Sequence, residues 1–211
     1  MSVLFPVVIS APSGGGKTTI KNEIIKRNKL FKFNITCTTR PKRKGEIDGK
    51  DYYFISDKEF DRMIKNGEFL EWARVHNWRY GTPRKSVDKA ISEGYFPIMT
   101  IDVNGAMSVK KIYPDSVLIF LIPPSPQALV DRLKKRGELM SDIKLRMKTA
   151  IREIKKIPKF DYIVVNDDIK KTAKKIENIV FSNLCKISNN MDIIKRFIDK
   201  ASKITDYGGV K

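Results

Sequence analysis

The segment from Ala11 to Thr19, "APSGGGKTT", contains residue types that bind phosphate groups. Its three successive glycines allow backbone torsions that turn N–H groups inward around phosphate oxygens. Lys17 follows as a point charge for the outer phosphates, and the hydroxyl of Thr18 is a candidate ligand of Mg²⁺. The expected phosphate-binding residues are Ala11, Pro12, Ser13, Gly14, Gly15, Gly16, Lys17, Thr18 and Thr19.

The elements on either side of this segment decide whether its glycines form a binding loop or an accidental flexible turn. Val3–Ser10 is an apolar, β-rich run, and Lys17–Asn28 places isoleucines on one face of an expected helix. The order strand, glycine turn, helix is the context in which a phosphate-binding loop occurs. We therefore expect a nucleoside triphosphate and Mg²⁺ at this position, although Ala11 stands where the pattern usually has glycine.

The rest of the chain alternates between apolar strands and helices. Strands are expected at 95–102, 116–123 and 162–167, and helices are expected at 127–136, 143–156 and 169–184. Because the strands at 95–102 and 116–123 are apolar without alternation, they should be buried on both faces of a mostly parallel sheet. The pattern predicts a doubly wound α/β fold. The segment from 33 to 84 has short strands, turns and a helix at 57–66, which is typical of an insert.

The insert contains a second group of residues suited to an anion. Arg40 and Arg43 lie three positions apart and are followed by Tyr52 and Tyr53. Guanidinium groups bind phosphate oxygens in pairs, and phenol hydroxyls donate further hydrogen bonds. Taken alone, the segment is more typical of an exposed basic loop, because runs of charge are usually solvated.

Composition narrows the possible partners. The chain of 211 residues has a formal net charge of +18, with lysines scattered over nearly every expected helix, which favours small anionic ligands over a nucleic-acid groove. Cys37 and Cys185 are too few for a disulfide framework or a four-cysteine zinc site, and the lone His76 has no ligand cluster around it. Without a signal peptide or an apolar run of membrane-spanning length, we expect a cytoplasmic protein with no membrane partner.

The tail from 185 to 211 begins with a polar break and then contains one amphipathic helix. Its apolar face is formed by Ile193, Ile194, Phe197, Ile198 and Ala201. A helix of this kind usually docks on its own domain, so we expect docking rather than partner binding.

Several motifs together resemble the guanylate kinases, a family of P-loop nucleoside monophosphate kinases. They are "SAPSGGGKTT", "TTRPKRKGEIDGKDYYF", "GEFLEWARVHNWRYGT", "IDVNG", "RLKKRG" and "YIVVNDD", in the family's order and near its spacings. The resemblance covers roughly Val3 to Phe181 and leaves the tail uncovered.

The resemblance implies a P-loop NTPase fold and transfer of the γ-phosphoryl group of ATP to GMP with Mg²⁺. It implies a core of residues 1–33, 86–130 and 151–184, a GMP-binding insert at 34–85, a lid at 131–150 and an extension at 185–211. The implied GMP-binding residues are Thr36, Arg40, Arg43, Tyr52, Glu71, Tyr80, Thr82 and Asp102. The implied catalytic cations are Lys17, Arg40, Arg43, Arg132, Arg136 and Arg146, and the adenine site includes Asn166 and Asp167.

The chain departs from the family pattern at a few positions. Thr100 stands where an acid is usual, Asn104 replaces a usual glutamine, and the segment between Arg136 and Arg146 is one residue short. Two other functions therefore stay open: a binding module without turnover, and a kinase for AMP, UMP or CMP. The intact glycines and Lys17 speak against the first, and Glu71 with Thr82 speaks against the second. The chain is expected to be a monomer or a homodimer.

Overall fold

The computed structural model describes residues 4–75 and 77–206. His76 and the two ends of the chain, 1–3 and 207–211, lie outside the described residues. Among the described helices, none is long and apolar enough to cross a membrane.

A five-stranded parallel sheet forms the centre of the molecule. Its strand order is β2 (Phe31–Phe33), β7 (Phe96–Met99), β1 (Val7–Ser10), β8 (Val117–Ile122) and β9 (Tyr162–Val165). Every neighbouring pair is parallel. β1 and β7 are buried along their whole length, and so is β8 apart from its last residue, as their unbroken apolar runs predict. β9 forms one edge, and its side chains are exposed more often than buried.

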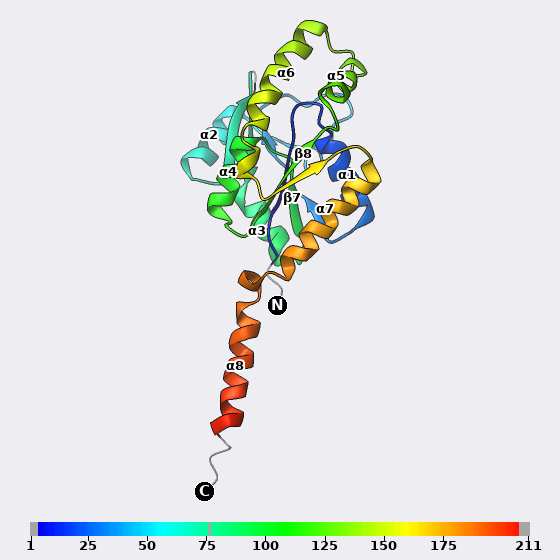
Figure 1. Ribbon diagram of the computed structural model, residues 1–211. Helices are drawn as coiled ribbons and strands as arrows, with labels where there is room; N and C mark the ends of the chain where they lie inside the picture. Colours follow the sequence, from blue (N-terminus) through cyan, green and yellow to red (C-terminus); the bar gives the residue numbers. More distant parts are fainter. Residues whose placement is uncertain (1–3, 76, 207–211) are drawn as a thin grey trace.

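Helices cover both faces of this sheet, which confirms the doubly wound α/β prediction (Figure 1). On one face, α1 (Lys17–Arg27) and α7 (Ile169–Leu184) join the core cluster that contains the β1 residues Val7 and Ile9. On the other face, α3 (Arg84–Ser92) and α4 (Val103–Ile112) pack in a second cluster. α3 was not predicted, because the irregular insert was expected to extend as far as Arg84.

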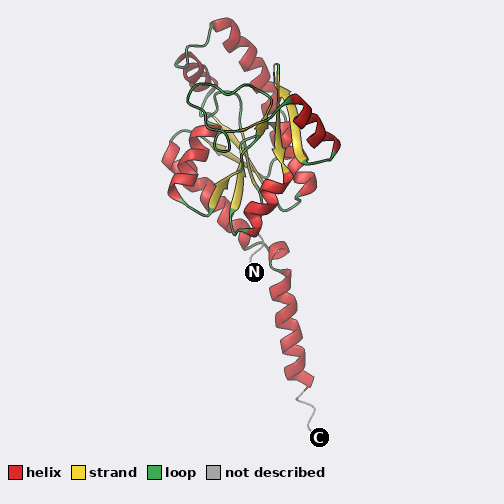
Figure 2. Ribbon diagram, turned by 180° about the vertical axis from the view of Figure 1, so that it is seen from behind, coloured by secondary structure: helices red, strands yellow, loops and turns green. Residues whose placement is uncertain are grey.

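A second sheet lies beside the first (Figure 2). It contains β3 (Cys37–Thr38), β4 (Tyr53–Phe54), β5 (Phe69–Val75) and β6 (Trp78–Pro83) in the order β4-β3-β6-β5. β5 and β6 pair as an antiparallel hairpin. The helix predicted at 57–66 is found as α2 (Asp57–Lys65), and it encloses a small separate core with the sheet.

Two helices stand together at the end of the molecule farthest from the C-terminus (Figure 1). α5 (Pro126–Lys134) and α6 (Met140–Ile154) pack through their own cluster of Leu129, Leu133, Ile143 and Ala150. Because this cluster is separate from the main core, the helix pair is attached to the body rather than built into it. A short 3-10 turn (Ile157–Lys159) leads from α6 to β9.

The tail differs from its prediction. After a 3-10 turn (Ile187–Asn189), α8 (Met191–Asp206) projects from the body instead of docking on it (Figures 1 and 2). The side chain of Phe197, in the middle of the expected docking face, is 74% exposed. The docking prediction was wrong because periodicity identifies an apolar face without identifying what covers it.

Candidate active site

The glycines of the 11–19 loop occupy positions that other residues fit poorly. Gly14 and Gly16 have φ angles of +85° and +98°, in the left-handed region that favours glycine. A Cβ atom on Gly16 would lie 2.4 Å from Nδ2 of Asn166, and one on Gly15 would lie 2.7 Å from Cβ of Ala11. The loop is therefore folded in a way that only this glycine pattern permits.

The loop leads directly into α1, whose first turn has no side-chain cap and no acidic residue. Unpaired N–H groups and the positive end of the helix dipole make such a terminus a binding site for anions. Nζ of Lys17 donates to the carbonyl oxygen of Ala11. Burial lowers the pKa of Lys17, while Glu153 and Asp102 nearby oppose that shift. Thr18 and Thr19 follow on exposed positions.

A cavity of about 360 Å³, here called the loop cavity, opens beside the glycines. It is lined by Gly14, Gly16, Thr19, Arg132, Lys135, Arg136, Asn166, Asp167 and Ile169. Nδ2 of Asn166 donates to the carbonyl oxygen of Gly15 over 2.8 Å, and Arg132 donates to the carbonyl oxygen of Asn166 over 2.7 Å. Asn166 thus connects β9 to the loop. Lys135 and Ile169 are lining residues that the sequence analysis missed, since neither belongs to a recognisable motif.

The three predicted arginines of the helix pair all reach the loop side of the molecule. Arg132 and Arg136 line the loop cavity, and Arg146 of α6 donates to the hydroxyl of Ser13 over 2.5 Å. Arg146 also pairs with Glu138, one of the residues in the unusual short segment. The shortened segment therefore supplies a carboxylate that holds Arg146 beside the loop.

A second cavity of about 190 Å³, here called the insert cavity, lies between the two sheets. It is lined by Phe33, Thr36, Tyr52, Glu71, Ala73, Tyr80, Thr100, Ile101 and Asp102. Five of the predicted residues, Thr36, Tyr52, Glu71, Tyr80 and Asp102, are thus brought together from the insert and from the end of β7. Phe33, Ala73 and Ile101 were not foreseen, because apolar lining residues resemble core residues in a sequence.

Glu71 is the buried carboxylate of the insert cavity. It lies on β5 opposite Thr82 of β6, whose hydroxyl donates to Oε1 of Glu71 over 2.5 Å. A Cβ atom on Gly105 would lie 3.0 Å from Oε2, so α4 approaches the carboxylate closely. Burial raises the pKa of Glu71 to about 7, and the charge of Asp102 adds to this shift while the Thr82 hydrogen bond opposes it. Asp102 itself caps α4 by accepting from the N–H of Gly105.

The two arginines of the insert share one carboxylate. Arg40 is buried and pairs with Glu46 over 2.6 Å, and its guanidinium lies 5.5 Å from the ring centroid of Tyr52. The other oxygen of Glu46 accepts from the backbone N–H of Arg43 over 2.8 Å, while Arg43 is exposed. Rings of Tyr52 and Tyr80 meet edge to face at 5.9 Å. Glu46 was missed, although an acid three residues after a cation is a signal for such a local pair.

The residues near the loop suit a magnesium ion that is held mainly by phosphate groups. Within the described residues, no group of three or more His, Cys, Asp or Glu side chains could hold a metal by itself. Mg²⁺ commonly keeps several waters and takes only one or two protein ligands besides phosphates. Oε2 of Glu153 is buried without a hydrogen-bond partner and lies near Lys17, which leaves one acidic oxygen available in this region. Thr100 lines the insert cavity, and Asn104 is exposed and accepts from Lys156.

The chain is similar to known guanylate kinases in sequence and in fold. The profile of the family described as guanylate kinase matches residues 4–183. A guanylate kinase of Thermotoga maritima is 47% identical over 191 residues, which is 90% of this chain and 92% of the relative. One of Caldanaerobacter subterraneus is 44% identical over 188 residues, 89% and 91% of the two chains. A crystal structure of guanylate kinase from Anaplasma phagocytophilum matches with a TM-score of 0.73 at 35% identity, covering 89% of this chain and 90% of that one.

Proposed function

The chain belongs to the guanylate kinase family, and we propose how its two cavities divide that family's reaction. The reaction is phosphoryl transfer from ATP to GMP, which yields ADP and GDP. We assign ATP to the loop cavity and GMP to the insert cavity. The observation that carries the assignment is the buried Glu71–Thr82 pair in the insert cavity, because its hydrogen-bonding groups match guanine.

Guanine offers two adjacent donors, N1–H and the 2-amino group, and a carboxylate can accept both. Adenine has an acceptor at N1, which the Glu71 carboxylate would repel. Because Thr82 donates to Oε1, the carboxylate is held in one orientation before the base arrives. Buried polar sites of this kind reject the wrong partner by as much as ~10⁴-fold. Thr36 and Asp102 complete the base site.

The phosphate of GMP is assigned to Arg40, Arg43, Tyr52 and Tyr80. The support for this is the position of Arg40 beside the Tyr52 ring at the edge of the insert cavity. Glu46 keeps the guanidinium of Arg40 in place while the site is empty of substrate. A phosphate dianion can then bind both arginines without a large rearrangement of the loop.

The triphosphate of ATP is assigned to the N–H groups of residues 11–19 and to Lys17. Asn166 and Asp167 are assigned to adenine, because they line the loop cavity. An oxygen of the GMP phosphate attacks the γ-phosphorus in line, and no general base is needed since that oxygen is already anionic. Arg132, Arg136 and Arg146 neutralise the charge that spreads over the transferring group.

We assign Thr18 as the one protein ligand of Mg²⁺. When bound, the ion would supply positive charge that offsets the negative charge of the phosphates of ATP. The carboxylates of Asp102 and Glu153 are near enough to Lys17 to influence its pKa, so they can also accept hydrogen bonds from waters in this region. These two carboxylates supply acidic groups in a region where the family usually has an acid at the position of Thr100.

The segment boundaries follow from the same assignment. We propose that residues 34–85 are the GMP-binding insert, that 131–150 form a lid, and that 1–33, 86–130 and 151–184 form the core. The lid has its own small core, which allows it to move as a unit over the two nucleotides and exclude water. Since ATP and GMP are cytoplasmic metabolites, we place the enzyme in the cytoplasm, as a monomer or homodimer.

Calorimetric titration with each nucleotide separately tests the two assignments. Lys17→Ala should weaken binding of the non-hydrolysable analogue of ATP and leave GMP affinity unchanged. Glu71→Gln should do the reverse. If Lys17→Ala weakened GMP as strongly as the ATP analogue, or if Glu71→Gln left GMP affinity unchanged, the assignment of the cavities would be wrong.

A further inference from the structure

α8 exposes a continuous apolar face that nothing in the described chain covers. Phe197 is 74% exposed and Ile204 is 75% exposed, and the remaining members of the face are also open to solvent. These other members are Met191, Ile193, Ile194 and Ile198. Contiguous exposed apolar surface on a water-soluble domain usually marks an interaction site. An isolated helix of 16 residues is also marginal in water, so α8 needs a partner to be stable.

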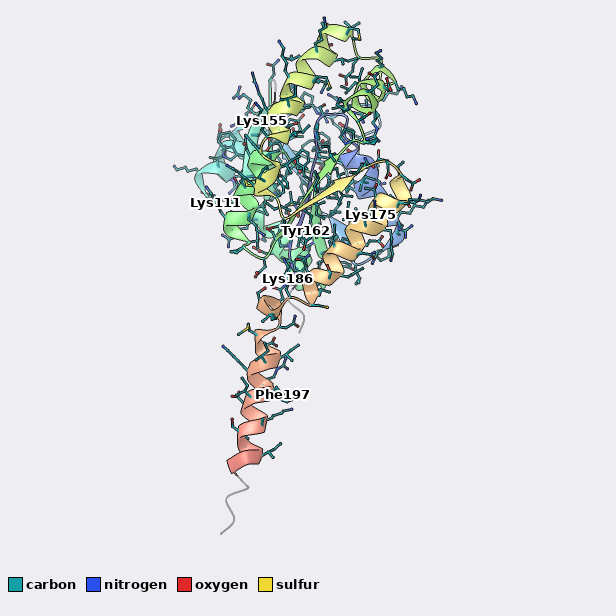
Figure 3. All side chains as sticks on the ribbon, in the orientation of Figure 1. Lys111, Lys155, Tyr162, Lys175, Lys186 and Phe197 are labelled. Atoms are coloured by element: carbon teal, nitrogen blue, oxygen red, sulfur yellow. The ribbon has the colours of Figure 1, made fainter. Side chains whose placement is uncertain are left out.

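The joint between α7 and α8 directs this face away from the chain's own body. Asn189 is buried, and its Nδ2 donates to the carbonyl oxygen of Asn183 over 2.7 Å. Nδ2 of Asn190 donates to the carbonyl oxygens of Leu184 and Lys186 over 2.6 and 2.8 Å. Figure 3 shows Phe197 well clear of the body below this joint. These bonds hold the turn between α7 and α8 in the conformation that projects α8 from the body, so we infer that the partner lies outside the same copy.

The breadth of the face distinguishes between possible partners. Consecutive residues of a helix are turned by about 100° about its axis. The apolar positions therefore occupy an arc of about 160°, with Ile193 at one border and Met191 at the other. A second helix would cover only the narrow seam of positions 191, 194, 198 and 201, spaced by three and four residues. Ile193, Phe197 and Ile204 would then stay in water. A flat apolar phase covers the whole face at once.

The charges at the two borders of the face favour an anionic partner. Lys200 lies about 20° beyond Ile193, and Lys195 lies about 40° beyond Met191, whereas Asp192 and Asp199 lie on the opposite side. Lysines at these borders can keep their stems on the apolar side and extend their charges outward. Two copies paired through this face would bring lysine next to lysine at both borders, and each copy has a formal net charge of +18.

We propose that α8 is a surface anchor that lies in the interface of an anionic lipid bilayer, with its apolar face in the acyl boundary and Lys195 and Lys200 at the headgroups. The positive charge of the body adds attraction to the same surface. A helix that lies on a bilayer needs no membrane-spanning length. α8 and the helix pair α5 and α6 are at opposite ends of the molecule (Figure 1), so the nucleotide cavities stay open to solution.

Vesicle flotation of the full chain tests this proposal, with vesicles of phosphatidylcholine alone or of phosphatidylcholine and phosphatidylglycerol at three to one. The chain should float with the anionic vesicles. Phe197→Ser should lower the partition coefficient about tenfold or more, since one large apolar side chain no longer leaves water. Lys203→Ser, on the polar side of the same helix, is the matched control and should change it less than threefold. Lys195→Glu with Lys200→Glu should abolish the preference for anionic vesicles.

Two results would overturn the proposal. One is that the unaltered chain floats with neither vesicle type. Equal GMP kinase activity of the unaltered chain and Phe197→Ser would show that both are folded. The other is a concentration-dependent dimer in sedimentation velocity that Phe197→Ser dissociates, because a second copy would then cover the face.

Discussion

Replacement of Glu71 by Gln should make the stability of the protein less dependent on pH. The pKa of Glu71 is raised from 4.5 to about 7, mainly by burial. The folded state therefore binds a proton more tightly than the unfolded state, and the stability contributed by this group is lost as pH rises from about 4.5 to about 7. At pH 8 the charged carboxylate costs about 3 kcal/mol, from about 2.5 pKa units at ~1.4 kcal/mol each. At pH 5 the cost is below about 1 kcal/mol.

Glutamine has no charge to bury, so this cost is absent in the variant at every pH. The exchange of a carboxylate oxygen for an amide nitrogen also changes the local hydrogen bonding, and this contribution does not vary with pH. The quantity to compare is consequently the stability difference between variant and unaltered protein at pH 8 minus the same difference at pH 5. We expect about 2 to 3 kcal/mol in favour of the variant.

Urea unfolding at pH 5 and pH 8 measures this quantity directly. Glu59→Gln in the same insert is the matched control, because Arg62 lowers the pKa of Glu59, so that this carboxylate is largely ionised at both pH values and its removal should give nearly the same stability difference at pH 5 and pH 8. A stability difference for Glu71→Gln that is equal at the two pH values would refute the argument that the site buries a charge.

The same variant should lose much of its preference for GMP over AMP. In the unaltered enzyme, kcat/KM for GMP should fall about tenfold per pH unit below about pH 7.

Further predictions concern the neighbours of Glu71 and the loop. Thr82→Val removes the donor that lowers the pKa of Glu71, so the acid limb of the kcat/KM profile for GMP should move to higher pH, and an unmoved limb would argue against the contact. Glu46→Gln releases the guanidinium that it holds, and KM for GMP should rise roughly tenfold with little change in kcat, as measured in steady state. Gly16→Ala should destabilise the fold by about 3 kcal/mol in urea unfolding, from backbone strain and a clash. Gly45→Ala, with a similar φ but open space, should cost only about 1 kcal/mol, and equal costs would contradict the clash.

The sheet and its covering helices could be predicted closely from the sequence. The helix expected at 169–184 is α7 with the same bounds, and the strands at 116–123 and 162–167 are β8 and β9 with shorter ends. These elements have unbroken apolar runs or a clear helical period, and such patterns depend mainly on burial in one core. The order of the five strands could not be predicted from periodicity, because it depends on which strands lie together in space.

The site was predictable where local motifs carry the chemistry. Gly14 and Gly16 line the loop cavity, and the hydroxyl of Thr82 donates to Glu71, which lines the insert cavity. Glu46 was missed although it lies three residues after Arg43, whereas Glu153 was missed because only the fold brings it near Lys17. The direction of α8 was also beyond the sequence, because it depends on hydrogen bonds that the side chains of Asn189 and Asn190 make at the joint.

Phosphoryl transfer from ATP to GMP with the help of Lys17 is the activity that we propose for this chain. A coupled assay of ADP release with ATP and Mg²⁺, and with GMP, AMP, CMP or UMP as acceptor, tests it most directly beside Lys17→Ala. We predict turnover with GMP alone and a loss of at least about a hundredfold in the variant. Comparable turnover with another acceptor, or equal GMP turnover in Lys17→Ala, would contradict the account.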